Sequence, residues 1–226
     1  MTQSRKYDDP CGIARALDVI GDRWALLVVR ELVFGPKRFV QLRAGLSSVS
    51  PNVLSERLRD LEAAGVVRRA ELAPPASVTV YELTERGRAL EPVLLELGRW
   101  GSQEPITTSR ELTPNALLVA LKTAFDPSAA TAEGKVSYEL NIDGNWFTVV
   151  VSGGGVAISR GRSDHPAATF SGDVATMRAV AFGREPLGTA EMAGRLEVTG
   201  DRELAERFTR MFPVLPAAQR ERRASR

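Results

Sequence analysis

The sequence predicts an α+β protein with two domains: a mostly helical domain with a two-stranded hairpin, followed by a domain that combines a sheet with helices. Three observations lead to this prediction. Within residues 1–101, capped segments carry apolar residues at helical spacing. Within residues 112–213, apolar and polar residues alternate between glycine-containing turns, as in half-buried strands. Between the two patterns, residues 102–111 are polar and poor in apolar side chains, which is typical of a linker.

Composition limits the kinds of site that the chain can hold. Its 226 residues are 43% hydrophobic and 26% charged, which suits two folded domains. A single cysteine, Cys11, excludes an intrachain disulfide and a cysteine-rich zinc cluster, and fits a reducing compartment. No apolar stretch reaches the roughly 20 residues of a spanning helix, and residues 1–10 do not resemble a secretory signal. We therefore expect a cytoplasmic protein without membrane insertion.

The order of elements in the first domain indicates a DNA-binding fold. Helices are expected over residues 13–20, 22–35, 38–44 and 51–64, with Asp22 as N-cap of the second and Ser50 with Pro51 at the start of the fourth. Strands follow over residues 66–72 and 78–83, joined by the hairpin 73–77. Thr84 then caps a last helix that reaches Trp100. This is the order of a winged helix-turn-helix, in which the hairpin is the wing.

The fourth helix has the sidedness of a DNA-recognition helix. Leu54, Leu58 and Leu61 form one apolar stripe, which turns Asn52 and Arg59 to the opposite side. Asparagine and arginine pair with adenine and guanine in the major groove, and amides at a helix N-terminus bind phosphate. A polar face alone does not indicate DNA binding, because any surface helix has one, and the net charge of the chain is only +2. The basic residues near this helix are what favour a DNA contact, since phosphate binding depends on local clusters of Lys and Arg. The predicted contacts are Lys37, Arg38, Ser50, Asn52, Ser55, Glu56, Arg57, Arg59, Arg68 and Arg69.

Several motifs of this domain together resemble the HxlR-type regulators, relatives of the MarR group. They are residues 14–24 (ARALDVIGDRW), 35–39 (GPKRF), 50–58 (SPNVLSERL), the Pro74-Pro75 pair and residues 81–84 (YELT), and the resemblance spans about residues 10–101. It implies a homodimer, held by the first and last helices, that binds inverted repeats in double-stranded DNA. The interface residues implied are Ile13, Leu17, Leu90, Leu94, Leu97 and Trp100.

Two positions bear on how far this resemblance extends. The family often carries a basic residue after the two prolines, where this chain has Ala76, which leaves a wing-tip contact with DNA unsupported. Some HxlR-type proteins sense oxidants through a cysteine at the position of Cys11. Asp8 and Asp9 would disfavour a thiolate there and Arg15 would favour one, so a reactive and an unreactive Cys11 both remain open.

The second domain is expected to be a sheet with helices on one face. Thr113 and Pro114 start a helix, and strands are expected over residues 135–142, 146–151, 156–159, 167–171 and 195–199. Asp143-Gly144 and residues 153–155 are the turns of two hairpins. Further helices are expected near residues 173–182, 187–193 and 201–212, and a basic tail covers residues 214–226. That tail is either a solvated terminus or an accessory contact with DNA.

The order of motifs over residues 112–213 resembles the sterol carrier protein family of type 2. The motifs are Asp143-Gly144 before Trp146, Gly161, Gly183 followed by Pro186, and residues 194–201 (GRLEVTGD). The resemblance implies a hydrophobic tunnel between sheet and helices that holds a small apolar molecule. Taken one at a time, each apolar residue at regular spacing is more simply explained as ordinary core. The candidate lining residues are Leu121, Phe125, Trp146, Phe170, Met177, Val180, Phe182, Met192, Phe208, Met211 and Phe212.

Neither catalysis nor a cofactor is predicted. The only histidine, His165, lies beside Asp164 in a loop without a serine or cysteine motif, residues 153–155 lack the Lys-Ser/Thr of a phosphate loop, and no metal-ligand spacing is present. The sequence therefore predicts a ligand-responsive, DNA-binding homodimer, a repressor rather than an enzyme. The alternatives are thiol sensing through Cys11 and, from another class, a lipid carrier whose helix-turn-helix serves only for dimerisation.

Overall fold

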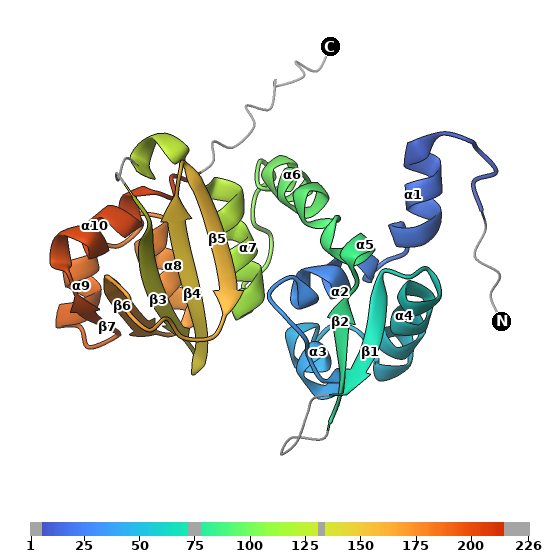
Figure 1. The fold of residues 1–226 in the computed structure, drawn as a ribbon, viewed down its shortest axis with the longest axis horizontal. Helices are drawn as coiled ribbons and strands as arrows, with labels where there is room; N and C mark the ends of the chain where they lie inside the picture. Colours follow the sequence, from blue (N-terminus) through green and yellow to red (C-terminus); the bar gives the residue numbers. More distant parts are fainter. Residues whose placement is uncertain (1–5, 72–77, 131–133, 215–226) are drawn as a thin grey trace, which may run out of the picture. The chain divides into compact units, whose positions relative to one another are not determined.

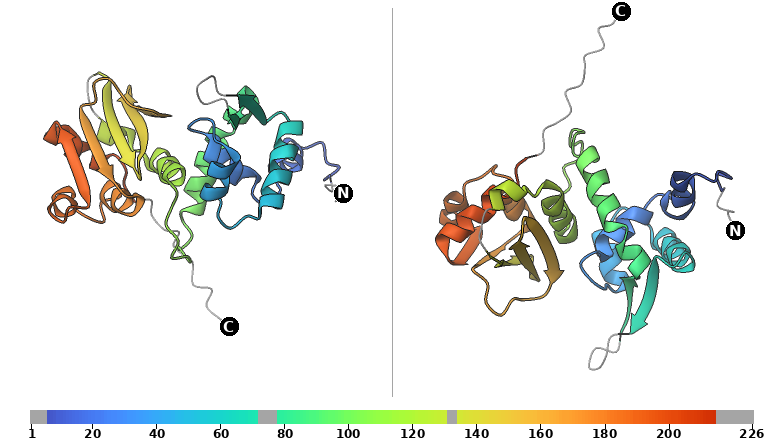
Figure 2. Two further views of the ribbon diagram at one scale, coloured as in Figure 1. Left: turned by 90° about the horizontal axis from the view of Figure 1, so that it is seen from below. Right: turned by 45° about the horizontal axis from the view of Figure 1, so that its top comes forward.

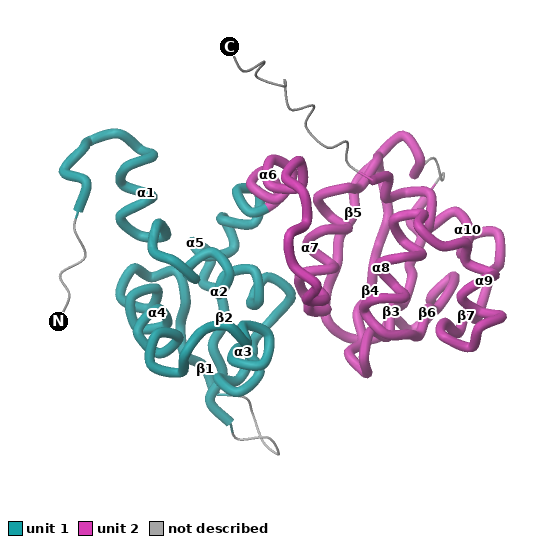
Figure 3. The backbone as a smooth tube through the Cα atoms, turned by 180° about the vertical axis from the view of Figure 1, so that it is seen from behind, with its two compact units in different colours: residues 1–94 teal, residues 95–226 magenta. Residues whose placement is uncertain are grey.

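A computed structural model of the chain describes residues 6–71, 78–130 and 134–214. The chain forms two compact units, residues 1–94 and 95–226, drawn in different colours in Figure 3. The first is helical with a two-stranded sheet, and the second is an α+β unit around a five-stranded sheet (Figure 1). The predicted fold class is confirmed. The hairpin at residues 73–77 and residues 215–226 of the basic tail lie outside the described residues.

The first unit follows the predicted order of elements, with one helix more than expected. Its elements are α1 (Gly12–Ile20), α2 (Ala25–Leu32), α3 (Phe39–Gly45), α4 (Pro51–Ala63), β1 (Val67–Glu71), β2 (Thr79–Leu83), α5 (Glu85–Arg88) and the first residues of α6 (Glu91–Gly101). Strands β1 and β2 are antiparallel, with Val67 opposite Leu83. Leu54, Leu58 and Leu61 of α4 are buried in one core with Val28 of α2, so the predicted apolar stripe faces inward.

Two helix starts differ from the prediction. Asp22 is not the N-cap of α2, because the chain passes through a left-handed turn at Trp24 (φ 82°) and the helix begins at Ala25. Thr84 does act as a cap, accepting a hydrogen bond from the Gly87 amide at 3.1 Å, but the helix that it caps is the short α5. The last helix is thus divided in two, and α6 begins at Glu91.

The second unit is built around a sheet with helices on one face. Its elements from residue 114 on are α7 (Pro114–Ala124), the 3₁₀ turn η1 (Pro127–Ala130), β3 (Val136–Ile142), β4 (Asn145–Ser152), β5 (Gly155–Arg160), β6 (Ala168–Gly172), α8 (Val174–Ala181), α9 (Leu187–Met192), β7 (Leu196–Gly200) and α10 (Arg202–Arg210). The strand order is β5-β4-β3-β6-β7. The views in Figure 2 show α7, α8 and α10 on the same side of this sheet.

One strand pair in this sheet is parallel. Strand β3 pairs with β4 antiparallel and with β6 parallel, and the other pairs are antiparallel. A parallel partner requires a crossover, and the connection from β5 to β6 passes over the face of the sheet that the helices leave open (Figure 1). On the covered face, Leu140, Phe147 and Phe170 are buried and form the core with Leu117 of α7.

Residues 102–111, the predicted linker, are exposed, and residues 105–113 have no regular secondary structure. The division between the two compact units falls earlier, after Leu94 and inside α6. The linker at residues 102–111 therefore remains a prediction.

Candidate functional site

Helix α4 carries the predicted reading face. The Ser50 hydroxyl accepts a hydrogen bond from the Val53 amide at 3.4 Å and so caps the helix, with Pro51 as its first residue. Asn52 and Arg59 are exposed, while Ser55 and Glu56 are half-buried. The Arg59 Nε donates to the Ser55 carbonyl oxygen at 3.4 Å, which draws the guanidinium back along the helix surface. The face opposite the buried leucines is therefore polar and open within this unit.

Arg57, which flanks this face, is held by acidic neighbours. Its guanidinium bonds to the carboxylate of Asp22 and lies 3.0 Å from that of Asp60 and 3.7 Å from that of Glu56. Only 14% of its side chain is exposed. Arg57 therefore ties α4 to the turn before α2, and its charge is largely satisfied inside the protein. This corrects the expectation that its guanidinium is available to DNA.

Lys37 is the second predicted DNA contact that is instead buried in an ion pair. Its ammonium lies 2.6 Å from the carboxylate of Glu31, which also binds Arg30 at 2.8 Å and is fully buried. Burial raises the pKa of the Glu31 carboxyl, but the charges and hydrogen bonds of Lys37 and Arg30 lower that pKa by more, so it lies below its ordinary value. The Lys37 backbone also pairs with Tyr81 of β2. Lys37 thus anchors the turn before α3.

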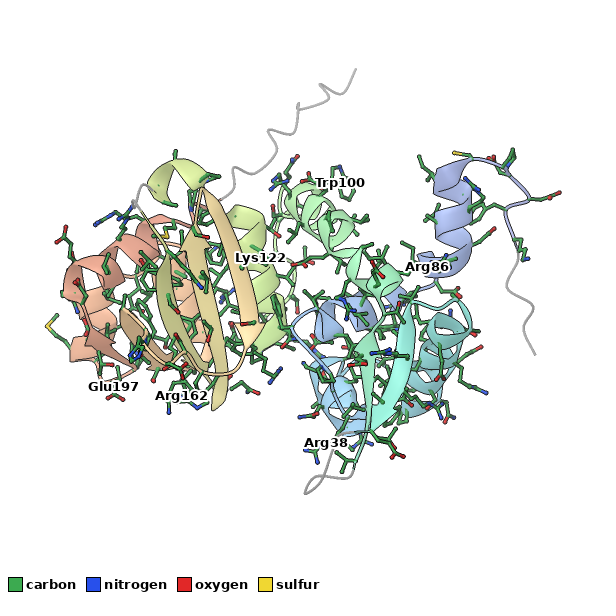
Figure 4. The ribbon with its side chains drawn as sticks, in the orientation of Figure 1. Arg38, Arg86, Trp100, Lys122, Arg162 and Glu197 are labelled. Carbon is green, nitrogen blue, oxygen red and sulfur yellow. The ribbon has the colours of Figure 1, made fainter. Side chains whose placement is uncertain are left out.

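The other basic residues remain accessible. Arg38, at the N-cap of α3, is exposed and is labelled in Figure 4. At the root of the hairpin, Arg68 pairs with Glu82 at 2.6 Å, and 64% of its side chain is exposed. Arg69 lies 3.4 Å from Glu62, with about half of its side chain exposed. Both wing arginines are therefore paired within the unit and still in reach of solvent.

Two further arginines of the first unit were missed by the sequence reasoning. Arg43 on α3 is exposed, and no local signal separates it from an ordinary surface residue. The Arg86 guanidinium of α5 donates a hydrogen bond to the Ala64 carbonyl oxygen at the end of α4, at 3.0 Å. A cation at a helix C-terminus satisfies a free carbonyl and the helix dipole. Arg86 therefore fixes the far end of α4, a role that only the folded arrangement reveals.

The residues predicted for a dimer interface fall into two groups. Ile13, Leu17, Leu97 and Trp100 are exposed apolar side chains, so they are accessible to a second copy. Leu94 is instead buried in the core of the first unit, and Leu90 packs against that core. The prediction that these two contact a second copy rather than the local core is not supported by their burial.

The residues predicted to bind an apolar ligand mostly meet in the interior of the second unit. The Phe208 ring lies 4.9 Å from the rings of both Tyr138 and Phe170 and 5.0 Å from that of Phe212, measured between centroids. Phe125 lies 6.1 Å from Phe212. Leu121, Met177, Val180 and Met211 are buried, and Phe182 is half-buried. These rings fill the space between the sheet and the helices.

Two of these predictions are wrong, and one residue was missed. Met192 is 86% exposed at the end of α9, because α9 buries Leu187 and Ala190 instead. Trp146 lies on the open face of the sheet, beside Asn141 and under the Arg162 guanidinium at 4.1 Å, since it alternates with the inward-facing Phe147. Tyr138, which was not predicted, is fully buried among the rings.

The remaining candidate residues lie apart from both sites. Cys11 is exposed immediately before α1, and its backbone amide donates to the Asp9 carboxylate at 2.8 Å. Within the described residues there is no cluster of His, Cys, Asp or Glu suited to a metal ion. No described helix combines the length and the apolar character needed to cross a membrane.

Comparison with known proteins matches the chain to two families, one after the other along the sequence. Residues 19–107 match the model of the HxlR-like helix-turn-helix family, and residues 115–213 match that of the SCP-2 sterol transfer family. The uncharacterised HTH-type transcriptional regulator YvaP of Bacillus subtilis is 41% identical over 90 residues, which cover 39% of this chain and 82% of that protein.

Two further matches concern a regulator from the same organism. The HTH-type transcriptional regulator YodB of B. subtilis is 36% identical over 88 residues, covering 39% of this chain and 79% of YodB. The solved structure of its reduced form matches 41% of this chain and 92% of that chain at 35% identity, with a TM-score of 0.38.

Proposed function

This chain is a transcriptional regulator of the HxlR-like helix-turn-helix family with an added SCP-2 domain, and from that membership we propose that it is a ligand-responsive repressor. It binds an inverted-repeat operator as a homodimer and holds a small apolar effector in its second unit. The observation that carries the DNA-binding part is the open polar face of α4, with Asn52 and Arg59 exposed opposite three buried leucines.

The roles of the basic residues follow from their surroundings. Asn52 and Arg59 read base edges, whereas Arg38 contacts the phosphate backbone from the start of α3. Lys37 and Arg57 act indirectly, because their ion pairs with Glu31 and Asp22 hold the turns on either side of α2. Arg68 and Arg69 are placed at the wing root, where they reach the flanking backbone.

The test is duplex binding by the full chain, titrated against salt. We expect the affinity for a duplex from the region upstream of its own gene to fall steeply between about 50 and 200 mM salt, because cations released from DNA drive binding. Arg59→Ala or Asn52→Ala should reduce the preference over a scrambled duplex by about 1–3 kcal/mol, whereas Arg38→Ala should weaken both duplexes alike.

The matched control is Arg184→Ala, which removes an exposed arginine in the turn after α8. If Arg59→Ala kept the same preference between the two duplexes as this control, α4 would not be the helix that reads the bases. A protein that binds no duplex at any salt concentration would instead be the lipid carrier considered above, in which the helix-turn-helix serves only for dimerisation.

The contiguous apolar interior of the second unit supports an apolar effector. Because the rings of Phe208 and Phe212 occupy that space, a ligand has to displace them, and this movement involves α10. A ligand changes DNA affinity only if it binds two states unequally. Mass spectrometry of lipid released from the purified protein, followed by duplex titration with and without that lipid, checks the effector part of the proposal.

The exposure of Cys11 favours thiol sensing as a second candidate function. The residue lies immediately before α1, and its backbone amide donates a hydrogen bond to the carboxylate of Asp9 at 2.8 Å. With one cysteine in the chain, a disulfide at Cys11 has to join two copies or be a mixed disulfide with a small thiol. Diamide should then weaken duplex binding by the natural chain and not by Cys11→Ser. An equal response of both proteins would eliminate this function.

A further inference from the structure

A ligand-sized cavity lies on the face of the sheet opposite the helices, apart from the aromatic interior. Its volume is about 660 Å³, within the range of small-molecule sites. Its walls come from β3, β4, β5 and the connection that crosses the open face, with Leu204 of α10 at its edge. Ser137 and Thr148 line it from the sheet, where they alternate with the inward-facing Tyr138 and Phe147. The cavity is therefore separated from the apolar interior by the thickness of the sheet.

The wall formed by the connection, residues 161–167, is held to the sheet by a buried carboxylate. Glu139 is almost fully buried and accepts hydrogen bonds from the Ser163 amide at 2.8 Å and from two nitrogens of Arg162 at 3.3 and 3.4 Å. The Arg162 guanidinium also stacks on the ring of Trp146. Figure 4 shows Arg162 at the lower end of the sheet. These contacts fix the connection, so the cavity is a built feature of the unit.

The polar part of the cavity lining consists mainly of hydrogen-bond donors and cations. Lys135 and Arg162 bring positive charge, and His165 lies beside them. The hydroxyls of Ser137 and Ser163 lie 3.0 Å apart. One carboxylate, that of Asp164, also lines the cavity, and Glu139 beneath it offsets part of the charge of Arg162. A ligand that accepts hydrogen bonds and carries negative charge fits such a lining better than an apolar one.

Part of the lining is apolar. Val150 of β4, Ala167 before β6 and Leu204 of α10 contribute carbon surface to the same cavity. A molecule with a carbon body can therefore cover these residues while its charged group meets the donors. An inorganic ion alone would leave this carbon surface in contact with water.

We propose that this cavity binds a small organic anion, a carboxylate or a phosphate ester, with Lys135 and Arg162 as its charge partners. The site goes beyond the proposed function, because an anion could not enter the aromatic interior without losing its hydration uncompensated. It gives the second unit two ligand sites of opposite character, one on each face of the sheet.

Calorimetric titration of the full chain with benzoate, phenyl phosphate and benzamide tests the site. Benzoate and benzamide share one body and differ in charge, so benzoate should bind and benzamide should bind at least fivefold more weakly. Lys135→Ala should weaken benzoate binding about tenfold, the usual effect of losing one charge-assisted hydrogen bond. Lys135 is the residue to change because Arg162 also holds the connection in place.

Arg184→Ala, which removes a cation elsewhere on the same unit, is the control and should leave benzoate binding unchanged. Binding of phenyl phosphate without benzoate, or of benzoate without phenyl phosphate, supports the site and identifies the preferred anion. Three results overturn it: binding of neither anion, equal binding of benzamide and benzoate, or equal affinity in Lys135→Ala and the natural chain. None of these results depends on duplex binding or on an apolar ligand.

Discussion

Glu31 is the charged side chain most deeply enclosed by the first unit. Its carboxylate neutralises Lys37 and Arg30, and it also fills the space next to Gly45, where a Cβ would come within 2.6 Å of its Oε2. A buried pair of this kind adds little net stability compared with apolar residues, but removing one partner leaves a buried charge without compensation. The geometry of the turn before α3 therefore depends on Glu31 being ionised.

Glu31→Gln should lower the free energy of unfolding by about 3 kcal/mol at pH 7. The lowered pKa of Glu31 means that its contribution is complete above pH 4.5, its ordinary value, and is lost as the pH falls through the folded-state pKa. The difference between the natural chain and the variant should thus shrink in acid. Urea unfolding at several pH values measures it.

Glu96→Gln is the matched control, since Glu96 pairs with Arg99 and 72% of its side chain is exposed. An exposed pair of this kind contributes at most about 1 kcal/mol. A loss in Glu31→Gln as small as in this control, or a difference that does not change with pH, would contradict the role given to Glu31.

Tyr138 presents the opposite situation, a buried polar atom without a partner. Among the described residues, none bonds to its hydroxyl. Burial raises the pKa of this phenol, and the hydroxyl therefore stays neutral. Tyr138→Phe should raise the free energy of unfolding by about 1 kcal/mol, because an unsatisfied hydroxyl no longer has to be desolvated. Thermal unfolding beside Tyr7→Phe, an exposed control, measures this, and a less stable Tyr138→Phe would mean that the hydroxyl does have a partner.

At the scale of single elements, local signals located most helix starts. Ser50 and Thr113 each accept a hydrogen bond from the amide three residues on and precede a proline, and both helices begin where the sequence predicted. Partners distant in sequence could not be predicted in this way. Arg57 meets Asp22 across 35 residues, and that contact decides whether its charge is available to DNA.

The candidate sites show the same division between local and distant information. The open face of α4 follows from helical periodicity alone, so Asn52 and Arg59 were predicted as exposed. In the second unit, the alternation along β4 did not tell which face the helices cover, and Trp146 was therefore placed on the wrong side of the sheet. The cavity on the open face depends on the path of residues 161–167, which no short motif encodes.

Gly87 decides how closely α5 approaches Val66, the residue before β1, and the end of β2 at Leu83. A Cβ at this position would lie 2.1 Å from the Val66 carbonyl oxygen, a backbone atom that cannot move aside cheaply. Gly87→Ala should therefore destabilise the first unit by about 1–3 kcal/mol, as overpacking does elsewhere. Gly101→Ala is the control, because a Cβ there meets open space and alanine favours helix. Equal unfolding midpoints for the two variants would contradict this contact.

At the scale of the whole molecule, the exposed apolar residues of α1 and α6 bear on assembly. Ile13 is 73% exposed and Leu97 is 46% exposed. In a homodimer formed by these helices, Ile13→Glu and Leu97→Glu should each yield monomers in analytical ultracentrifugation and weaken operator binding, because both half-sites must be occupied together. Met192→Glu, at an exposed position of α9, is the control. Dimers that survive both substitutions would place the interface elsewhere.

The parallel pairing of β3 with β6 has a consequence for the order of folding. The two hairpins that join β3 to β4 and β4 to β5 close over short turns, whereas Tyr138 meets Ala168 only after both hairpins have been spanned. Distant pairings form more slowly than near ones. In pulse-labelled hydrogen exchange, the amides of β6 and β7 should therefore gain protection after those of β4 and β5. The cavity on the open face of the sheet would then be completed only when β6 and β7 have joined the sheet.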